Sequence, residues 1–382
     1  MMRRPGTSAC LPPLAALLCL LHPACRPLEP EPPSRRAKWS VALGASTGDL
    51  TTVGPDNTVY CLDGTGLRAL DRDGRTRWRR SLSGIGLCPP VVGGDSTTCL
   101  LVQRDGDYHI QLTAVASDGE IKWHRQLLST STPHHPGLAM AADNTIYCAL
   151  DSFLFAVAPD SSLRWQLPLG DCVSCPPTIG RDGTIYVGAR QGLIAVAPDG
   201  SPGWRHLISE GLDEPPVIAP DNTIYYSNRQ GQLAALDPEG NCLWRRQGGL
   251  PVIGADQVAR FWSGHDTLCE LHPDGTSVYR PTERSGCLAV TDDGTTYCTW
   301  SGSESIFTTD AGMAALNADG SLRWTFTAVG DHYGAWPPTV GPDGTVYFCT
   351  IFNLYAVADS GDTRTCFWPM YRHDAQLTGR AR

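Results

Sequence analysis

The sequence predicts an all-β fold, and three observations support this prediction. First, a unit recurs about eight times: an Asp-Gly or Asp-Asn turn, a Tyr, an Ala-Val or Ala-Leu pair, a second turn and a Trp. Second, the units follow one another at intervals of about 40 residues, which is the period of propeller blades. Third, 40 Gly and 30 Pro fall at regular turns, as expected for many short strands. The predicted fold is an eight-bladed β-propeller of four-stranded antiparallel blades, with seven blades as the alternative.

Residues 175–204 show how one unit makes a blade. Residues 178–180, 184–188 and 193–197 predict three strands, and a fourth strand surrounds Trp204. Asp-Gly turns separate them, because these residues tolerate the positive φ that a hairpin needs. Sheets of this kind arranged radially bury both faces against their neighbours, and closure of the ring leaves only short edges.

The Trp in the fourth strand of each unit predicts a structural docking role. A large flat ring can cover the seam between two blades, and the small Ala of the unit leaves room for it. The docking positions are Trp78, Trp123, Trp165, Trp204, Trp244, Trp324 and Trp368. In unit 6, Tyr279 is expected in the Trp position. Residues 38–44 resemble an additional outer strand, so the two chain ends are expected to share one blade, whose outer strand contains either Trp39 or Trp368.

The N-terminal residues predict export. A basic start at Arg3 and Arg4 precedes an apolar stretch over 11–21, which is too short to span a bilayer. Cys25 resembles the lipidated cysteine of bacterial lipoproteins and predicts a periplasmic or outer-membrane lipoprotein. The alternative is a secreted protein in which Cys25 is removed or is a plain thiol. The predicted organisation is a signal peptide (1–25), a Pro/Glu-rich tether (26–37) and one propeller domain (38–382).

The charge and the cysteines restrict the partners. A net charge of −9 gives no electrostatic footprint for nucleic acid or anionic lipid, so we expect a monomer that meets a membrane only through its lipid anchor. Fifteen cysteines in an exported chain suggest disulfides, although many occupy strand positions that are apolar in sister units. Cys172 and Cys175 are expected to form a local disulfide, with two free thiols, a redox pair or a metal pair as alternatives.

Two units carry a resemblance to a known family. Residues 69–78 and 315–324 both read Ala-Leu, an Asp-Gly turn and Trp, and they resemble the tryptophan-docking repeats of the pyrroloquinoline-quinone-like β-propellers. The tail over 368–380 resembles a terminal motif of exported bacterial members. The resemblance covers about residue 38 to the end and implies the propeller fold. It implies no single activity, since the scaffold serves quinone-dependent dehydrogenases and the outer-membrane assembly lipoprotein BamB.

The residues that such dehydrogenases use are missing from this sequence. Those enzymes typically carry adjacent paired cysteines and acidic and amide ligands for calcium, and no Cys-Cys dipeptide occurs here. Pro176 follows Cys175, where covalent haem would require His. We therefore expect no cofactor, pyrroloquinoline quinone included, and a non-catalytic platform that binds envelope proteins. The alternative is a quinone-dependent dehydrogenase-like enzyme or a carbohydrate-binding relative with a pocket at the channel mouth.

The candidate contact residues lie in the connections that vary between units. Connections from the fourth strand to the next blade, and from the second strand to the third, emerge on one face of the ring, whereas the uniform turns occupy the other. Function favours variable loops on a rigid scaffold. The candidates are His134, His135, Asp213, Glu214, Trp300, Phe307, His332, Tyr333 and Trp336. The alternative for the histidines and acids is a solvated loop, because no ligand spacing supports a metal site.

Overall fold

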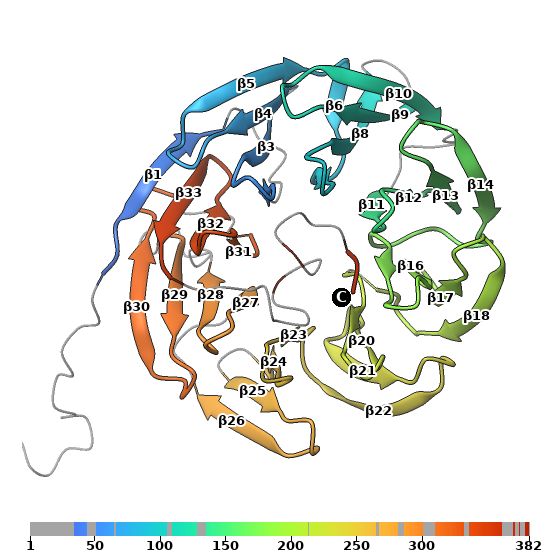
Figure 1. The fold of residues 1–382 in the computed structure, drawn as a ribbon. Coiled ribbons are helices and arrows are strands. Elements are labelled where there is room, and N and C mark those ends of the chain that lie inside the picture. The colour runs from blue at the N-terminus through green and yellow to red at the C-terminus, as the bar shows by residue number, and fades with distance from the viewer. Residues whose placement is uncertain are drawn as a thin grey trace, which may run out of the picture.

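A computed structural model of the chain describes residues 34–43, 51–64, 66–104, 109–127, 135–212, 214–264, 267–281, 286–300, 310–331, 336–360, 370, 374 and 379–381. Within these residues the regular elements are β-strands, and they form eight sheets arranged as the blades of a ring (Figure 1). The fold is an eight-bladed β-propeller, as predicted, and the alternative of seven blades is wrong. The described part of the chain contains no helix that is long and apolar enough to cross a membrane.

The strands of each blade run from the channel to the outer wall. Blade 1 consists of β2 (Thr52–Val53), β3 (Val59–Asp63), β4 (Gly66–Leu70) and β5 (Thr76–Ser81), and blade 2 of β7 (Val91–Val92), β8 (Thr98–Arg104), β9 (Ile110–Val115) and β10 (Ile121–Leu127), with β6 (Gly84–Gly86) beside β8. Blade 3 consists of β11 (Gly137–Met140), β12 (Ile146–Leu150), β13 (Phe153–Val157) and β14 (Leu163–Pro168). Blade 4 consists of β15 (Thr178–Ile179), β16 (Ile185–Ala189), β17 (Gly192–Val196) and β18 (Pro202–Leu207). Blade 5 consists of β19 (Val217–Ile218), β20 (Ile224–Ser227), β21 (Gln232–Leu236) and β22 (Cys242–Gln247), and blade 6 of β23 (Val252–Ile253), β24 (Ala259–Trp262), β25 (Thr267–Leu271) and β26 (Ser277–Pro281). Blade 7 consists of β27 (Leu288–Val290), β28 (Thr296–Trp300), β29 (Gly312–Leu316) and β30 (Leu322–Thr327). Blade 8 consists of β31 (Thr339–Val340), β32 (Thr345–Cys349), β33 (Asn353–Ala358) and, from the N-terminal end of the chain, β1 (Ala37–Ala42).

The first turn of every blade is held by an Asp. In blade 4, Asp182 Oδ1 accepts a hydrogen bond from the Thr184 backbone N–H over 3.0 Å, and Thr184 Oγ1 donates to Asp182 Oδ2 over 2.8 Å. Gly183, between them, has a φ of 87°, and Asn57 holds the same place in blade 1 with a φ of 60°. The backbone bond to Asp recurs in all eight blades at 2.9 to 3.1 Å. The Asp-Gly/Asn-Thr motif is therefore a turn that fixes the first hairpin.

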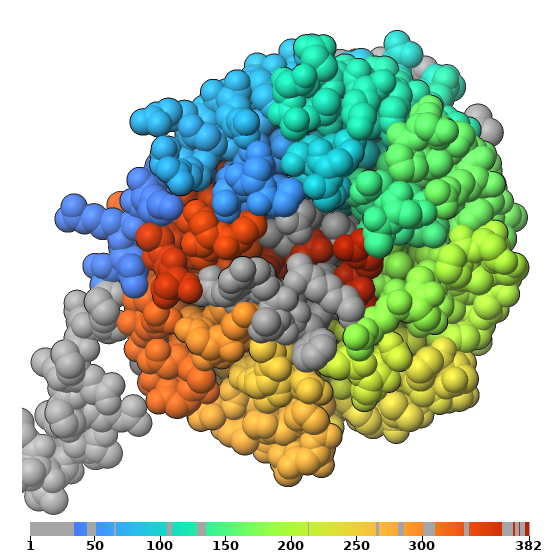
Figure 2. Space-filling view, in the orientation of Figure 1, coloured from blue at the N-terminus to red at the C-terminus, as the bar shows by residue number. Residues whose placement is uncertain are grey.

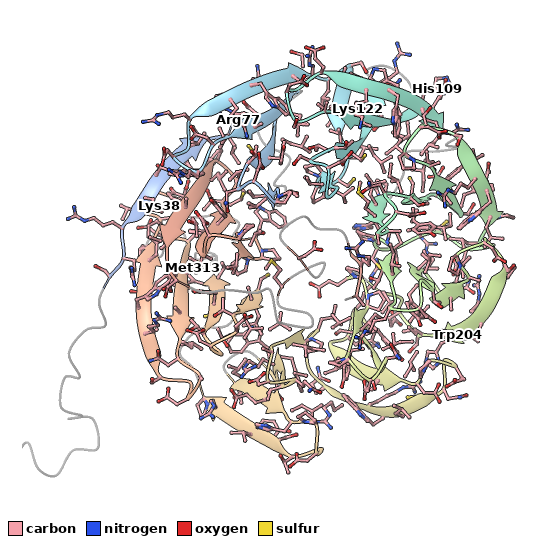
Figure 3. All side chains as sticks on the ribbon, in the orientation of Figure 1. Lys38, Arg77, His109, Lys122, Trp204 and Met313 are labelled. Atoms are coloured by element: carbon pink, nitrogen blue, oxygen red, sulfur yellow. The ribbon has the colours of Figure 1, made fainter. Side chains whose placement is uncertain are left out.

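The fourth-strand tryptophans join neighbouring blades. Trp204 lies on the outer part of the ring, and its indole N–H donates to Pro238 O in the turn of blade 5 over 2.8 Å (Figure 3). A Cβ on Gly240 of that turn would lie 2.6 Å from the Trp204 ring, so only glycine fits beneath it. Within its own blade, Trp204 packs against Tyr186 with ring centroids 5.8 Å apart. Equivalent indole bonds of 2.8 to 3.0 Å are made by Trp78, Trp123 and Trp165.

Both chain ends contribute to the closure of the ring. β1 pairs with β33, so the N-terminal strand completes blade 8, and Trp39 donates to Arg72 O over 2.9 Å. Of the two alternatives for this outer strand, the structure has Trp39, and Trp368 lies outside the described residues. Near the other end, Ile179 N–H donates to Gly379 O over 2.7 Å, so the last residues extend blade 4 across the ring from blade 8 (Figure 1). Figure 2 shows these C-terminal atoms in the middle of the ring.

Blade 6 replaces the aromatic pair with charged side chains. In its register, Arg260 lies opposite Glu270 and Glu270 lies opposite Val278, so Tyr279 is not in the Trp position and is exposed. β26 pairs with β25 without the register shift that most other fourth strands have, which moves its side chains by one position. Buried Glu270 accepts from Arg280 Nε over 2.9 Å and lies 3.6 Å from Arg260 Nε.

Candidate functional site: a pocket at the channel mouth

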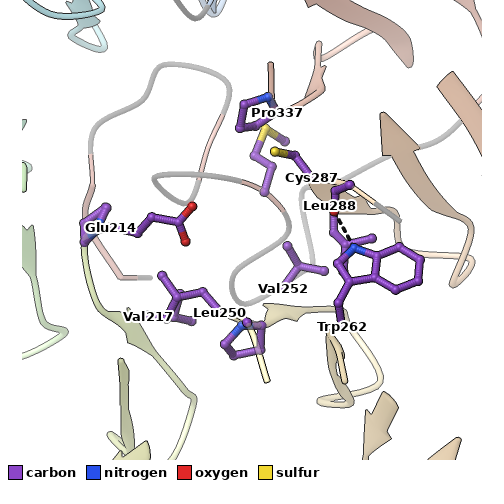
Figure 4. A pocket seen from close by; sticks show the side chains of 13 residues that line it. Glu214, Val217, Leu250, Val252, Trp262, Cys287, Leu288 and Pro337 are labelled. Atoms are coloured by element: carbon purple, nitrogen blue, oxygen red, sulfur yellow. Dashed lines mark hydrogen bonds between the residues drawn. The ribbon is translucent and has the colours of Figure 1, made fainter. Parts of the chain in front are cut away.

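A pocket of about 170 Å³ lies beside the central channel, where the connections into blades 5 to 8 meet (Figure 4). Its lining residues are Glu214, Pro215, Val217, Gly249, Leu250, Pro251, Val252, Trp262, Gly286, Cys287, Leu288, Pro337 and Met370. Most of them immediately precede β19, β23, β27 or β31. The pocket is therefore built from the fourth-to-first connections that the sequence singles out as the variable face.

The pocket is apolar apart from one carboxylate and one thiol. Figure 4 shows the exposed Glu214 side chain directed into the pocket from the side opposite Trp262 and Cys287. Burial raises the pKa of the Cys287 thiol to about 12, and the nearby Glu214 carboxylate raises it as well. The thiol is therefore protonated at neutral pH and is a poor nucleophile. Trp262 Nε1 donates to Gly286 O, which fixes the wall between blades 6 and 7.

Trp336 lies next to this pocket, beside the lining residue Pro337. Its backbone N–H donates to Cys349 O over 3.2 Å, and its carbonyl accepts from Thr299 Oγ1 over 3.2 Å. The ring is half-buried against the core shared by blades 1 and 8. Its indole N–H has no hydrogen-bond partner among the described residues. Trp336 and Glu214 are thus the two candidate residues that the structure places at the channel mouth.

Trp300 differs from its prediction as an exposed contact residue. Its side chain is 9 % exposed and belongs to a core cluster of blades 6 and 7. The ring folds back over its own hairpin, where Gly312 leaves room for it: a Cβ there would meet the indole ring. Trp300 Nε1 donates to Asp310 O over 3.2 Å, so its polar atom is satisfied inside the blade.

Of the remaining contact candidates the structure describes His135, which does not line the pocket. His135 is exposed and has a φ of 51°. Outside the described residues lie Cys25, His134, Asp213, Phe307, His332 and Tyr333. Within the described residues, no group of three or more His, Cys, Asp or Glu side chains is placed to hold a metal ion.

No disulfide joins Cys172 to Cys175, in contrast to the prediction. The Cys172 side chain is exposed, whereas Cys175 is buried in the core of blades 4 and 5 and fills the space left by the missing side chain of Gly188. The two thiols thus occupy opposite environments. The loop is held by Asp171 instead, whose carboxylate accepts from the backbone N–H of Cys172 over 2.8 Å and of Gln191 over 2.9 Å.

Exposed apolar side chains are the functional feature that the sequence prediction missed. We call the face with the fourth-to-first and second-to-third connections the loop face; it includes Ile85, Leu207, Glu214, Val329 and Phe352. Val329 is 84 %, Leu207 69 % and Phe352 53 % exposed, and Ile85 is exposed too. The two most exposed large apolar side chains therefore lie on the loop face, whereas other exposed apolar residues lie in the fourth strands: Leu163, Leu243, Val278, Tyr279 and Leu322. Exposed apolar groups of this size are typical of interaction surfaces. Phe352 could have been found from sequence, because the equivalent turns of blades 4 and 5 contain Gln191 and Gln230.

The chain matches the model of one protein family, described as outer membrane protein assembly factor BamB, over residues 30–239, 151–276 and 189–365. No curated protein matches the chain.

Solved structures share the fold. BamB from Moraxella catarrhalis is 14% identical with a TM-score of 0.65, and the match covers 85% of this chain and 100% of that chain. Virginiamycin B lyase from Staphylococcus aureus is 12% identical with a TM-score of 0.54, over 84% of this chain and 98% of that chain. A streptogramin B lyase is 12% identical with a TM-score of 0.52, over 84% and 98%. At these identities the solved structures show the fold alone. Because the family model matches well over half of the chain, this protein belongs to the BamB-like family of pyrroloquinoline-quinone-like β-propellers.

Proposed function

We propose that this protein is a non-catalytic platform at the cell envelope that binds a partner protein through its loop face. The observation that carries the proposal is the set of exposed apolar side chains on that face, led by Val329 and Leu207. Apolar groups that are in water before association and buried after it drive most protein contacts. The family description as an outer membrane protein assembly factor agrees with a partner in the envelope.

The channel-mouth pocket suits an anchoring side chain of the partner. Its volume of about 170 Å³ is smaller than the roughly 300 to 1,000 Å³ of ordinary ligand pockets. Leu250 and Val252 offer apolar walls, and Glu214 offers a negative charge at one side. A partner side chain with an apolar stem and a cationic end, such as Lys or Arg, would satisfy both parts.

A lyase-like or quinone-dependent activity is less well supported by the pocket. Its titratable lining residues are Glu214 and Cys287, and the raised pKa of Cys287 leaves that thiol protonated. Catalysis by proton transfer usually needs a positioned acid and base with pKa values near the working pH. We therefore infer that the protein works without pyrroloquinoline quinone or another cofactor.

Export and lipidation complete the proposal. We propose that residues 1–25 direct export, that Cys25 is acylated and that the protein acts as a monomer held at a membrane by this anchor. Replacement Cys25→Ser should release the protein from the membrane fraction. Unchanged membrane fractionation would contradict the lipoprotein assignment while leaving the loop face as a binding surface.

The loop face is tested with matched apolar-to-charged changes. Tagged protein would be purified from solubilised envelopes, and co-purified proteins identified by mass spectrometry. Leu207→Asp and Val329→Asp should lose the partner that the unchanged protein retains. The control is Leu322→Asp, because Leu322 is also exposed, at 43 %, but begins β30 at the opposite end of the blade. Loss of the partner in Leu322→Asp alone, or a bound quinone absorbance in the purified protein, would contradict the proposal.

A further inference from the structure

The seam between blades 5 and 6 lacks the docking contact found at the other seams described above. At the preceding seam, a Cβ on Gly240 would lie 2.6 Å from the Trp204 ring. Gly275 holds the equivalent place in blade 6, but a Cβ there would meet nothing within 4 Å. Trp244, the docking residue of blade 5, donates its indole N–H to no acceptor among the described residues. The sequence retains both halves of the contact, and the structure separates them.

A second donor is also displaced at this seam. Two residues after Trp78, Arg80 Nε donates to the turn carbonyl of Gly119 over 2.6 Å. Arg125 and His206, which follow Trp123 and Trp204 by the same spacing, lie 2.6 and 3.0 Å from the equivalent carbonyls. Arg246 instead lies 4.3 Å over the Trp244 ring and donates to Ser277 Oγ over 3.3 Å. The two donors that bind the turn of the next blade at the sister seams therefore do not bind the turn of blade 6, which is itself formed between His272 and Thr276.

A cleft of about 440 Å³ occupies the space between these residues. Tyr225, Leu243, Trp244 and Arg246 line it from blade 5, and His272 and Gly275 line it from blade 6. Figure 1 shows the outer strands of these two blades, β22 and β26, following one another along the outer wall. The cleft shares no lining residue with the channel-mouth pocket.

We propose that this cleft binds an Asp-Gly-Glu β-turn of a separate polypeptide. The sister seams supply the geometry. At the seams made by Trp78 and Trp204 the turn glycine lies beneath the indole ring. One turn carbonyl accepts from the indole N–H, and the carbonyl two residues later lies against the Arg or His. The seam between blades 1 and 2 indicates the charge of the bound turn. There, Arg80 Nη2 pairs over 2.5 Å with Oε1 of Glu120, the residue directly after Gly119. Arg246 stands at the Arg80 position, so it complements an acidic residue that follows the glycine.

The binding arm of the test uses the full chain and a backbone-cyclised hexapeptide that contains Ser-Asp-Gly-Glu, the sequence of residues 117–120. Titration calorimetry should detect the peptide with the unchanged protein. Trp244→Phe and Arg246→Gln should each weaken binding about tenfold, because each removes one donor. The matched control Trp165→Phe should bind as the unchanged protein does. No binding by the unchanged protein, or equal weakening in the control, would overturn the proposal.

The stability arm needs no ligand. Trp204→Phe removes the bond to Pro238 O and should lower the Tm, whereas Trp244→Phe should leave the Tm unchanged because its N–H binds no turn. Equal decreases would mean that the seam is closed by its own turn in solution, and the proposal would be wrong. Sedimentation gives the last outcome: self-association that Trp244→Phe abolishes would assign the cleft to a second copy of this chain and overturn the assignment to a separate polypeptide.

Discussion

Trp324 Nε1 donates to the carboxylate of Asp359 over 2.8 Å, where tryptophans of earlier blades donate to a main-chain carbonyl of a turn. Blade 8 takes its fourth strand from the N-terminal end of the chain, so no third-to-fourth turn is available there to supply that carbonyl. The Asp359 side chain, which is almost fully buried, takes its place. It also accepts from the Tyr297 hydroxyl over 3.1 Å and lies 3.3 Å from Arg323 Nη2.

Loss of this carboxylate should weaken the seam between blades 7 and 8. Asp359→Ala leaves Trp324 Nε1 without its buried acceptor and removes one of the two carboxylates that pair with Arg323. We expect the free energy of unfolding to fall by about 3 to 5 kcal/mol, as when one member of a buried charged pair is removed. Urea titration at pH 7 measures it. Asp73→Ala is the control, because Asp73 pairs with Arg75 at the surface and should change stability by about 1 kcal/mol or less. Equal losses would contradict the role given to Asp359.

Removal of β1 should destabilise the whole ring. Deletion of residues 1–42 takes away the outer strand of blade 8 and the Trp39 contact with blade 1, and it should lower the Tm in a single cooperative transition. Deletion of residues 1–33 retains the strand and should melt like the full chain. Circular dichroism during heating distinguishes them. Coincident melting curves would show that closure does not depend on β1.

A methyl group at Gly74 should disturb the closure contact. A Cβ there would lie 2.6 Å from the Trp39 ring, and Gly74 has a φ of 81°. Gly64 is a matched control, since it has a φ of 60° but nothing within 4 Å of an added Cβ. Gly64→Ala should therefore lose only the backbone preference of about 1 to 2 kcal/mol, and Gly74→Ala should lose more. A smaller loss at Gly74, measured by urea denaturation, would argue against the Trp39 contact.

The turn aspartates should make stability depend on acid pH. Hydrogen bonds from Ser162 lower the pKa of Asp160, and hydrogen bonds from Ser201 lower that of Asp199. A carboxyl with a lower pKa in the folded state binds fewer protons there than in the unfolded chain. Stability is therefore full above about pH 4 and declines as the pH falls through the folded pKa values. Urea midpoints between pH 6 and 2 should fall on acidification, and Asp160→Asn with Asp199→Asn should reduce that dependence. If the urea midpoint of the double variant fell with pH as steeply as that of the unchanged protein, the role given to these two aspartates would be contradicted.

The thiols offer a probe of the channel-mouth pocket. Exposed Cys172 and Cys242 should react first with a maleimide, and Cys287 should react slowly at pH 8 because its pKa is raised to about 12. Glu214→Gln removes a negative charge that raises this pKa, so it should speed the labelling of Cys287. Peptide mass spectrometry over time gives the rates. Equal rates in the two proteins would show that Glu214 does not act on the Cys287 thiol.

The repeat predicted the fold well because its turns and docking residues act locally. Asp182 with Thr184, and Trp204 with Gly240, form contacts that need only their own blade and the next. The site was harder to predict, since it depends on where side chains finally point. Trp300 is buried because Gly312 lets its ring fold back, and Cys175 turns inward while Cys172 turns outward. Trp244 and Gly275 both match the repeat, yet they are apart in the structure. β26 pairs with β25 without a register shift, and neither Trp244 nor Gly275 indicates this in the sequence.

The shared terminal blade also determines when the protein can fold. Lys38 in β1 donates to Thr345 in β32, a partner 307 residues later in the chain. On the ribosome, β1 is synthesised first, but its partner strand β33 is made only when most of the polypeptide has been synthesised. The long-range pairing of β1 with β33 therefore forms last. The ring therefore cannot close before synthesis of the chain is nearly complete. A prematurely terminated product would lack the sheet that β1 requires and would expose that strand to proteolysis or aggregation.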